Sequence, residues 1–246
     1  MSLSVIIIAK NEAQSIGKCL ESVSWAEEIV VIDCGSTDET VKICESFGAK
    51  IQVTDWPGFG PQKNRALDLA TGVWILSLDA DEIVTPELKN EIIGAISGAN
   101  AQAYSFPRSS SYCGRFMRHG GWWPDRVTRL FRKNSARFSD DLVHEKLIVD
   151  GKTGALSSPL IHIAFSDLEE VLQKIDRYST AGAIMMAKKN KKASLADAIF
   201  KGMWAFFRTY VLRGGFLDGK EGFMLAISNA EGTYYRYLKL MLMSEK

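Results

Sequence analysis

Two aspartates, Asp79 and Asp81, stand at the end of an apolar run in the segment WILSLDADEIVTPE. Alternate residues of a strand share one face, so both carboxylates are expected on the same side of the chain. Two carboxylates so placed repel each other unless a cation, a proton or a hydrogen-bond donor lies between them. Helix capping explains them poorly, because Thr85 and Pro86 already supply the start of the next helix. The pattern therefore predicts a divalent cation, Mg²⁺ or Mn²⁺, which prefers carboxylate, phosphate and water oxygens.

The elements that position these aspartates follow a repeating order of strand and helix. Apolar, β-branched runs bounded by turn residues predict strands at residues 3–9, 27–33, 50–54 and 73–79. Strands that alternate with helices indicate an α/β fold, in which a mostly parallel central sheet carries helices on both faces.

Capping patterns predict where the intervening helices begin. Asn11 followed three residues later by Gln14 predicts a helix from residue 12. Ser36 and Glu39 form the same pattern for a second helix, which ends at Gly48. A third helix is predicted within residues 58–72, and Thr85 with Pro86 begins a fourth.

Polar residues follow several of these strands, at the point where each strand ends. In sheets of this kind, ligands bind beyond the carboxyl ends of the strands. We therefore expect one polar rim that gathers Lys10, Asn11, Glu12, Asp33, Asp79 and Asp81. From about residue 103 the pattern changes to short strands and loops rich in glycine and aromatic residues, and after Ser166 the chain is predicted to be helical.

The composition of the 246-residue chain excludes several classes of protein. A net charge of +1 predicts no nucleic-acid partner, and no apolar run reaches the length of a membrane-spanning helix. The first residues lack the basic segment of a signal peptide, so we interpret them as a strand. The cysteines show no metal-binding or C-x-x-C spacing and are expected to stay reduced in the cytoplasm: Cys19, Cys34, Cys44 and Cys113.

Several segments together resemble the inverting glycosyltransferases of family 2 with the A-type, Rossmann-like fold. They are SVIIIAKNEAQSIGKCLESV, EIVVIDCGSTDETV, KNRALDLATGVWILSLDADE and VHEKL. The tail, with YVLRGGFLDGKEGF, is similar to the branch of β-glucosyltransferases that build the lipopolysaccharide core. The resemblance implies a nucleotide-sugar-binding catalytic domain over residues 1–165, whose segment 103–165 faces the acceptor. Residues 166–246 then form a helical C-terminal region.

The resemblance implies roles for the residues around the nucleotide base. Ala9 and Glu12 border the base, and Asp33 accepts a hydrogen bond from the uracil ring, with Ser36 in the same loop. A ring N–H needs such an acceptor. Turn chemistry is the alternative for Asp38, where both interpretations stay open, and we do not favour it for Asp33.

The resemblance also implies roles around the diphosphate of a UDP-sugar donor. Lys63 and Asn64 lie near the nucleotide and the diphosphate, Asp79 near the ribose, and Asp81 holds the metal ion. His162, in PLIHIAF, is either a core residue or a second metal ligand, and the sequence leaves both open.

An inverting transfer needs a base, because the acceptor hydroxyl must lose its proton as it attacks the anomeric carbon. The segment DDLVHEKL holds the candidates. The wider family has an acidic pair here, whereas this chain has His144 and Glu145. We choose Glu145, with Asp141 as the second candidate and His144 as a residue that orients the acceptor or the diphosphate. A surface ion pair of Glu145 with Lys146 is the structural alternative.

The acceptor side is predicted from GRFMRHGGWWPDRVTRLFRK, in which arginines alternate with tryptophans. Aromatic faces stack on sugar rings and arginine pairs with phosphate, so a glycolipid or a sugar phosphate fits this composition. We name Arg126, Arg129 and Trp122 as acceptor contacts. Core packing of Trp122 and Trp123 explains the tryptophans equally well.

Residues 188–215 hold seven bases and one acid, with aromatic residues between them. A basic helix with an aromatic face binds an anionic membrane surface, which predicts a peripheral protein at the inner face of the membrane. Packing on its own domain with a solvated lysine face is the alternative.

The sequence therefore predicts a metal-dependent inverting transfer of a hexose, most simply glucose, from a UDP-sugar to a lipid-linked or phosphorylated sugar. A sugar-phosphate nucleotidyltransferase is the first alternative, although it usually carries a glycine-rich loop after the first strand, where this chain has AKNEAQS. The second is a non-catalytic, membrane-associated protein that binds nucleotide sugars. A haloacid-type phosphatase also uses a D-x-D motif, but on its first strand. In this chain the motif ends the fourth predicted strand, which disfavours that class.

Overall fold

The computed structural model describes residues 2–139 and 146–244. These residues form two compact units that interleave along the chain. The first comprises Met1–Arg108 and Arg126–His162, and the second comprises Ser109–Asp125 and Ile163–Lys246. The division into domains 1–165 and 166–246 stays a prediction. The segment 109–125, which the sequence analysis assigned to the catalytic domain, belongs to the second unit.

The first unit is built on four parallel strands, as the alternation of strand and helix predicts. In the sheet they lie in the order β3, β2, β1, β4, with bounds Lys50–Val53, Glu28–Asp33, Leu3–Ala9 and Trp74–Asp79. Strand β1 pairs on both sides, with β2 and with β4, and every one of its residues is buried. A strand covered on both faces is expected to be largely apolar, which explains the LSVIIIA run; its one polar member, the buried Ser4, donates to the Glu28 carboxylate.

Beyond β4 the sheet becomes mixed. Strand β8 (Asp125–Arg132) pairs antiparallel with β4, and β6 (Ala103–Tyr112), β12 (Leu160–Phe165) and β5 (Glu82–Val84) follow in that order. The shorter strands are β7 (Arg115–Phe116), β9 (Ala136–Phe138), β10 (Leu147–Val149) and β11 (Thr153–Ala155). Strand β5 pairs antiparallel with β12, which brings a late part of the chain to the D-x-D turn.

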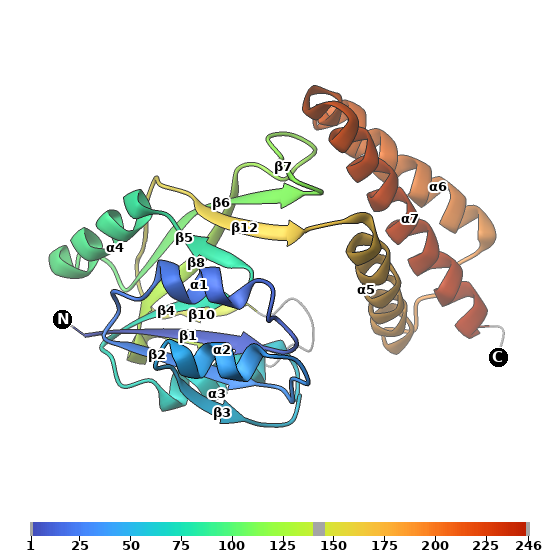
Figure 1. The fold of residues 1–246 in the computed structure, drawn as a ribbon. Coiled ribbons are helices and arrows are strands. Elements are labelled where there is room, and N and C mark those ends of the chain that lie inside the picture. Colours follow the sequence, from blue (N-terminus) through green and yellow to red (C-terminus); the bar gives the residue numbers. More distant parts are fainter. Residues whose placement is uncertain (1, 140–145, 245–246) are drawn as a thin grey trace. The chain divides into compact units, whose positions relative to one another are not determined.

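Helices cover both faces of this sheet (Figure 1). Successive residues of β1 point to opposite faces, so Val5 and Ile7 join one apolar cluster while Ile6 and Ile8 join another. The first cluster is completed by α1 (Ile16–Ser22), α2 (Thr40–Ser46) and α4 (Pro86–Gly98), and the second by α3 (Phe59–Leu69). The predicted fold class is therefore confirmed.

Two helices begin later than their capping patterns predict. The first starts at Ile16 and not at Glu12, and Asn11 adopts a positive φ of 56°. The second starts at Thr40, because the Ser36 hydroxyl accepts a hydrogen bond from the Asn11 amide, 2.8 Å away. The prediction for the fourth helix is confirmed: Thr85 accepts from the Leu88 amide at 3.1 Å, with proline in the first turn.

The second unit is mainly helical, as predicted. Its helices are α5 (Leu168–Lys188), α6 (Leu195–Phe207) and α7 (Gly219–Ser244), and α7 packs against both of the others. A π-helical turn at Arg208–Leu212 and a 3₁₀ turn at Gly215–Asp218 join α6 to α7. Gly202 allows the close approach of α6 to α7, since a Cβ there would lie 3.3 Å from the Ala230 carbonyl oxygen. Within residues 2–139 and 146–244, no helix is long and apolar enough to span a membrane.

Candidate active site

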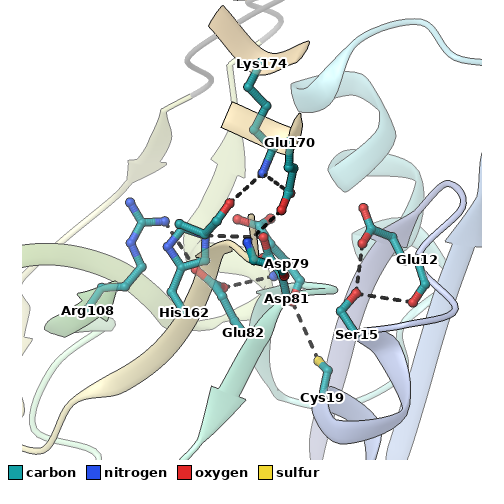
Figure 2. Close-up of polar contacts among 12 residues, drawn as sticks. Glu12, Ser15, Cys19, Asp79, Asp81, Glu82, Arg108, His162, Glu170 and Lys174 are labelled. Carbon is teal, nitrogen blue, oxygen red and sulfur yellow. Dashed lines mark hydrogen bonds and ion pairs between the residues drawn. The ribbon is translucent and has the colours of Figure 1, made fainter. Parts of the chain in front are cut away.

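The D-x-D pair lies in the tight turn between β4 and β5. Asp79 is the last residue of β4, and Glu82 is the first residue of β5. The turn is closed by a hydrogen bond of 2.9 Å from the Asp79 amide to the Glu82 Oε2 atom. In the pairing of β5 with β12, Glu82 lies opposite His162. Figure 2 shows the carboxylates of Asp79, Asp81 and Glu82 gathered at this turn, with His162 directed toward them.

A chain of alternating charges holds the turn in place. Asp79 pairs with the Lys63 ammonium, 2.9 Å away, and with the Arg129 guanidinium. Arg129 also reaches the Glu82 Oε1 atom at 2.9 Å. Arg108 pairs with the same oxygen at 3.3 Å (Figure 2). Glu82 is fully buried, and Lys63 and Arg129 are nearly so. Buried charges need partners of opposite sign, so these five residues form one interdependent network.

The network keeps Asp79 and Arg129 charged. Burial on its own would raise the pKa of Asp79, but the neighbouring Arg129 and Lys63 outweigh burial and hold that pKa well below its usual range. Burial lowers the pKa of Arg129, and the carboxylates of Asp79 and Glu82 more than reverse this effect. Asp79 is therefore an anion whose charge is already neutralised by protein cations, which leaves Asp81 as the carboxylate of the pair suited to a metal ion.

Asp81 and His162 form the second part of the site. The His162 Nε2 atom lies 3.3 Å from the Asp81 Oδ2 atom, and both side chains are partly exposed (Figure 2). A carboxylate oxygen and an imidazole nitrogen are both ligands of divalent transition metals such as Mn²⁺. Among the residues that the structure describes, no group of three or more His, Cys, Asp or Glu side chains could hold a metal. The pair fits a cation that takes its remaining ligands from a diphosphate and water.

The loops after β1 and β2 are tied together by Asp33 and Ser36. The buried Asp33 carboxylate accepts hydrogen bonds from the amides of Gly35 and Ser36, at 2.9 and 2.8 Å, and from the Ser36 hydroxyl. The sequence analysis did not favour turn chemistry for Asp33, and that judgement is wrong, because the side chain closes its own loop. The Asp38 carboxylate accepts from the Thr40 amide in its own loop and from the Ala13 amide in the loop after β1. The contact of Asp33 with uracil stays a prediction.

The other residues predicted around the donor are also engaged with the protein. The Glu12 carboxylate accepts from the Ser15 hydroxyl at 2.9 Å, and the Ala9 carbonyl accepts from the Cys34 amide at 2.9 Å. Asn64 is buried and bonds both backbone groups of Phe138, at 2.9 and 3.0 Å. Asn64 thus secures β9, while the neighbouring Lys63 reaches the Asp79 carboxylate.

The predicted acceptor contacts belong to different units of the chain. Arg126 donates to the backbone carbonyls of Ser105 and Leu156 in the first unit, at 3.0 and 2.7 Å. Arg129 is buried in the charge network described above. Trp122 belongs to the second unit, where its ring packs on Phe165 with centroids 6.0 Å apart. Core packing therefore accounts for Trp122, and the acceptor roles of all three residues stay predictions.

Comparison with known proteins identifies the family. The model of "Glycosyl transferase family 2" matches residues 4–150, which is more than half of the chain. The chain belongs to glycosyl transferase family 2. An uncharacterized glycosyltransferase of Rickettsia felis is 30% identical over 254 residues, covering 97% of this chain and 89% of the relative. The lipopolysaccharide core biosynthesis glycosyltransferase LpsC of Rhizobium meliloti is 28% identical, covering 97% and 90%.

Solved structures show the same fold for this glycosyltransferase. The crystal structure of S. aureus TarS 1–349 in complex with UDP-GlcNAc aligns over 100% of this chain and 93% of the TarS chain, with a TM-score of 0.51 and 15% identity. The likeness to this structure confirms the A-type architecture that the sequence predicted. Membership of the family also favours glycosyl transfer over the nucleotidyltransferase and phosphatase alternatives.

Two residues of the glycosyltransferase site were not predicted, and three that were predicted lie outside the described residues. Glu82 directly follows the D-x-D, and an acidic residue at that position was the available signal. Arg108 has no local signal, because the fold of β6 and not its neighbours in sequence brings it to Glu82. The candidate bases Glu145, Asp141 and His144 fall in the segment 140–145, which the structure does not describe.

Proposed function

We propose that this family 2 glycosyltransferase is a metal-dependent, inverting hexosyltransferase that moves glucose from UDP-glucose to a lipid-linked or phosphorylated sugar, such as a lipopolysaccharide core. The observation that carries the proposal is the Asp81–His162 pair, 3.3 Å apart at the carboxyl end of β4. The likeness to LpsC supports a core oligosaccharide as acceptor. The likeness to TarS, which was solved with UDP-GlcNAc, supports a uridine donor.

The charged residues at the turn have distinct roles in this proposal. Asp81 and His162 would hold the Mg²⁺ or Mn²⁺ ion, which would supply positive charge to stabilise the diphosphate leaving group. Lys63 lies beside the same turn and adds a fixed cation, while Asp79 faces the ribose. Glu82 contacts no substrate and keeps Arg129 and Arg108 in place. The loop closed by Asp33 and Ser36 borders the uracil ring.

The reaction is a single displacement. The acceptor hydroxyl oxygen forms a bond to the anomeric carbon as the bond from that carbon to the diphosphate oxygen breaks. Glu145 takes the hydroxyl proton in our assignment, with Asp141 or His144 as the alternatives. The electron pair of the broken bond stays on the diphosphate, so UDP leaves and the sugar inverts its anomeric configuration.

An exposed apolar surface supports a membrane-bound acceptor. We call it the α6 apolar face, and it comprises Leu195, Ile199, Phe200, Met203, Trp204, Phe207, Val211 and Leu212, all of them exposed. The members at 195, 199, 203, 207 and 211 recur four residues apart, and Phe200, Trp204 and Leu212 directly follow three of them, which places the set along one broad side of the helix. Phe200 is 70% exposed and Met203 is 64% exposed, far more than packing on the rest of the unit would leave.

Basic residues accompany this face and indicate what covers it. Lys191, Lys192, Lys201 and Arg208 are exposed in or next to α6. Apolar side chains bordered by lysine and arginine are typical of helices that lie in the interface of an anionic bilayer. We therefore propose peripheral attachment at the inner face of the membrane, where the catalytic unit meets cytoplasmic UDP-sugar.

The experiment that tests the proposed function is release of UDP from UDP-glucose by the purified chain with Mn²⁺, with and without EDTA. We expect EDTA to abolish release, and Asp81→Asn to lower it by about a hundredfold or more, because a carboxylate ligand is lost. Asp68→Asn is the matched control, since Asp68 forms only an exposed ion pair with Arg137. Equal rates for Asp81→Asn and the control would refute the proposal.

A further inference from the structure

A hollow in the second unit lies outside the site described above. It has a volume of about 370 Å³ and is lined by Arg118, His119, Gly121, Trp123, Pro124 and Arg213. The first five of these residues come from the loop after β7, and Arg213 follows the π-helical turn after α6. The hollow contains two arginines, one histidine and one indole ring, so its chemistry is cationic and aromatic.

Both arginines line this hollow. The Arg118 guanidinium carbon lies 4.6 Å from the centroid of the Trp123 ring, which fixes the side chain by a cation–π contact. Arg213 approaches Gly121 so closely that a Cβ atom there would lie 2.4 Å from its Nη1 atom. Within residues 2–139 and 146–244, neither guanidinium has an ion pair with a carboxylate.

The carboxylate nearest to the hollow is used by the protein itself. Asp218 is buried and accepts hydrogen bonds from the amides of Arg118 and His119, at 3.0 and 2.7 Å. Its other oxygen lies 3.1 Å from the His119 Nδ1 atom. Asp218 therefore fixes the loop and the imidazole ring, and the other ring nitrogen, Nε2, has no partner among the described residues.

We propose that this hollow binds a phosphate group, in the form of a phosphomonoester carried by the acceptor. Two arginines and a histidine line it, and arginine forks bind the oxygens of phosphate in pairs. A cation is disfavoured by the two arginines. The Trp123 ring beside them offers a face for the sugar that carries the phosphate. This inference rests on the proposed function, because it names the chemistry of the acceptor.

The position of Arg213 connects the hollow to the membrane surface. Arg213 directly follows Leu212 of the α6 apolar face, and Phe216 and Leu217, just after it, are 52% and 57% exposed. A phosphate at the base of a glycolipid lies at the level of the lipid headgroups. The same hollow could thus receive its phosphate from a sugar or from a lipid headgroup, and the test must separate these sources.

Calorimetric titration of the full chain with glucose 6-phosphate, and with glucose as the uncharged control, tests the proposal. We expect the phosphate ester alone to bind. Arg118→Gln and Arg213→Gln should each weaken binding about tenfold, as expected for loss of a charge-assisted hydrogen bond. Arg177→Gln, an exposed arginine on α5, is the matched control and should bind as the wild type does.

A second arm uses vesicles of phosphatidylcholine with and without phosphatidic acid. Binding of these vesicles alone, lost in Arg118→Gln, would show that a lipid headgroup and not the acceptor supplies the phosphate, and would overturn the assignment to the acceptor. Absence of binding to both probes, or equal binding by all variants, would overturn it. Donor-dependent UDP release by the wild type is measured in parallel, so failure of the proposed function is seen separately from failure of this site.

Discussion

The Nε2 atom of His162 lies 3.3 Å from the Oδ2 atom of Asp81, although the two residues belong to distant parts of the chain. The pairing of β5 with β12 explains this proximity, because it sets His162 opposite Glu82, the residue that follows Asp81. The D-x-D motif thus receives its histidine through strand pairing. The relationship supports a metal site that is assembled only when the late strand has joined the sheet.

The buried charge network should stabilise the fold. Glu82 accepts from Arg129 at 2.9 Å and from Arg108 at 3.3 Å. The substitution Glu82→Gln removes the negative charge that balances these two arginines. We expect the free energy of unfolding to fall by about 3 kcal/mol, as for other buried pairs that lose one partner. Urea unfolding measures this. Glu87→Gln, an exposed residue in the first turn of α4, should cost less than about 1 kcal/mol.

If the two variants unfold at the same urea concentration, the network does not hold the turn.

The strands were predictable because their burial dictates their composition. Strand β1 is apolar at every position except Ser4, since helices cover both of its faces, and the sequence pattern therefore gives its bounds directly. The two late helix starts were not predictable from capping rules. Asn11 and Ser36 do not cap their own helices. The Asn11 amide donates to the Ser36 hydroxyl, and the Asn11 side chain accepts from the Thr37 amide, so the two loops are joined by contacts that leave no local signal in the sequence.

The site was predictable in part for the same reason. Asp79 and Asp81 follow a recognisable strand pattern, whereas Lys63 was named only from the resemblance to the family; the structure brings Lys63 to Asp79. Arg108 and Glu82 meet through the order of strands in the sheet, which no local spacing reveals. Trp122 shows the opposite case, in which a motif typical of sugar binding packs on Phe165.

Glu28 should make stability depend on pH. Burial tends to raise its pKa, but hydrogen bonds from Ser4 and Thr71 outweigh burial and lower that pKa. A carboxyl with a lowered pKa contributes stability above its unfolded value, about 4.3, and loses that contribution as the pH falls below it. We therefore expect Glu28→Gln to destabilise the protein at pH 7 and to have a smaller effect at acid pH.

Urea unfolding of both proteins across this range measures the difference, and a cost that is constant with pH would contradict the assignment.

The catalytic base can be identified by separating binding from transfer. We expect Glu145→Gln to bind UDP-glucose as the wild type does and to lose transfer by a factor of about 10² to 10⁴, the usual contribution of a general base. Asp141→Asn and His144→Gln are the matched comparisons. Transfer that survives in Glu145→Gln and is lost in Asp141→Asn would move the assignment to Asp141.

The α6 apolar face should be required for membrane binding. We expect a double variant, Phe200→Ser with Trp204→Ser, to lose at least about tenfold in affinity for anionic vesicles, because two large side chains no longer enter the bilayer. Flotation with phosphatidylglycerol vesicles at low salt measures this. Phe47→Ser replaces an exposed phenylalanine in the first unit and should float as the wild type does. If the wild type does not float with the vesicles, the proposed membrane attachment is refuted.

The central claim is that Asp81 and His162 hold a cation that binds the diphosphate of a uridine donor. Thermal unfolding with UDP-glucose, in the presence and absence of Mn²⁺, tests it most directly. At a hundredfold excess over the dissociation constant, binding to the native state adds about 2.7 kcal/mol of stability. The account predicts a shift that needs both ligands and disappears in Asp81→Asn and His162→Ala. An equal shift without Mn²⁺, or one that survives in Asp81→Asn, would contradict it.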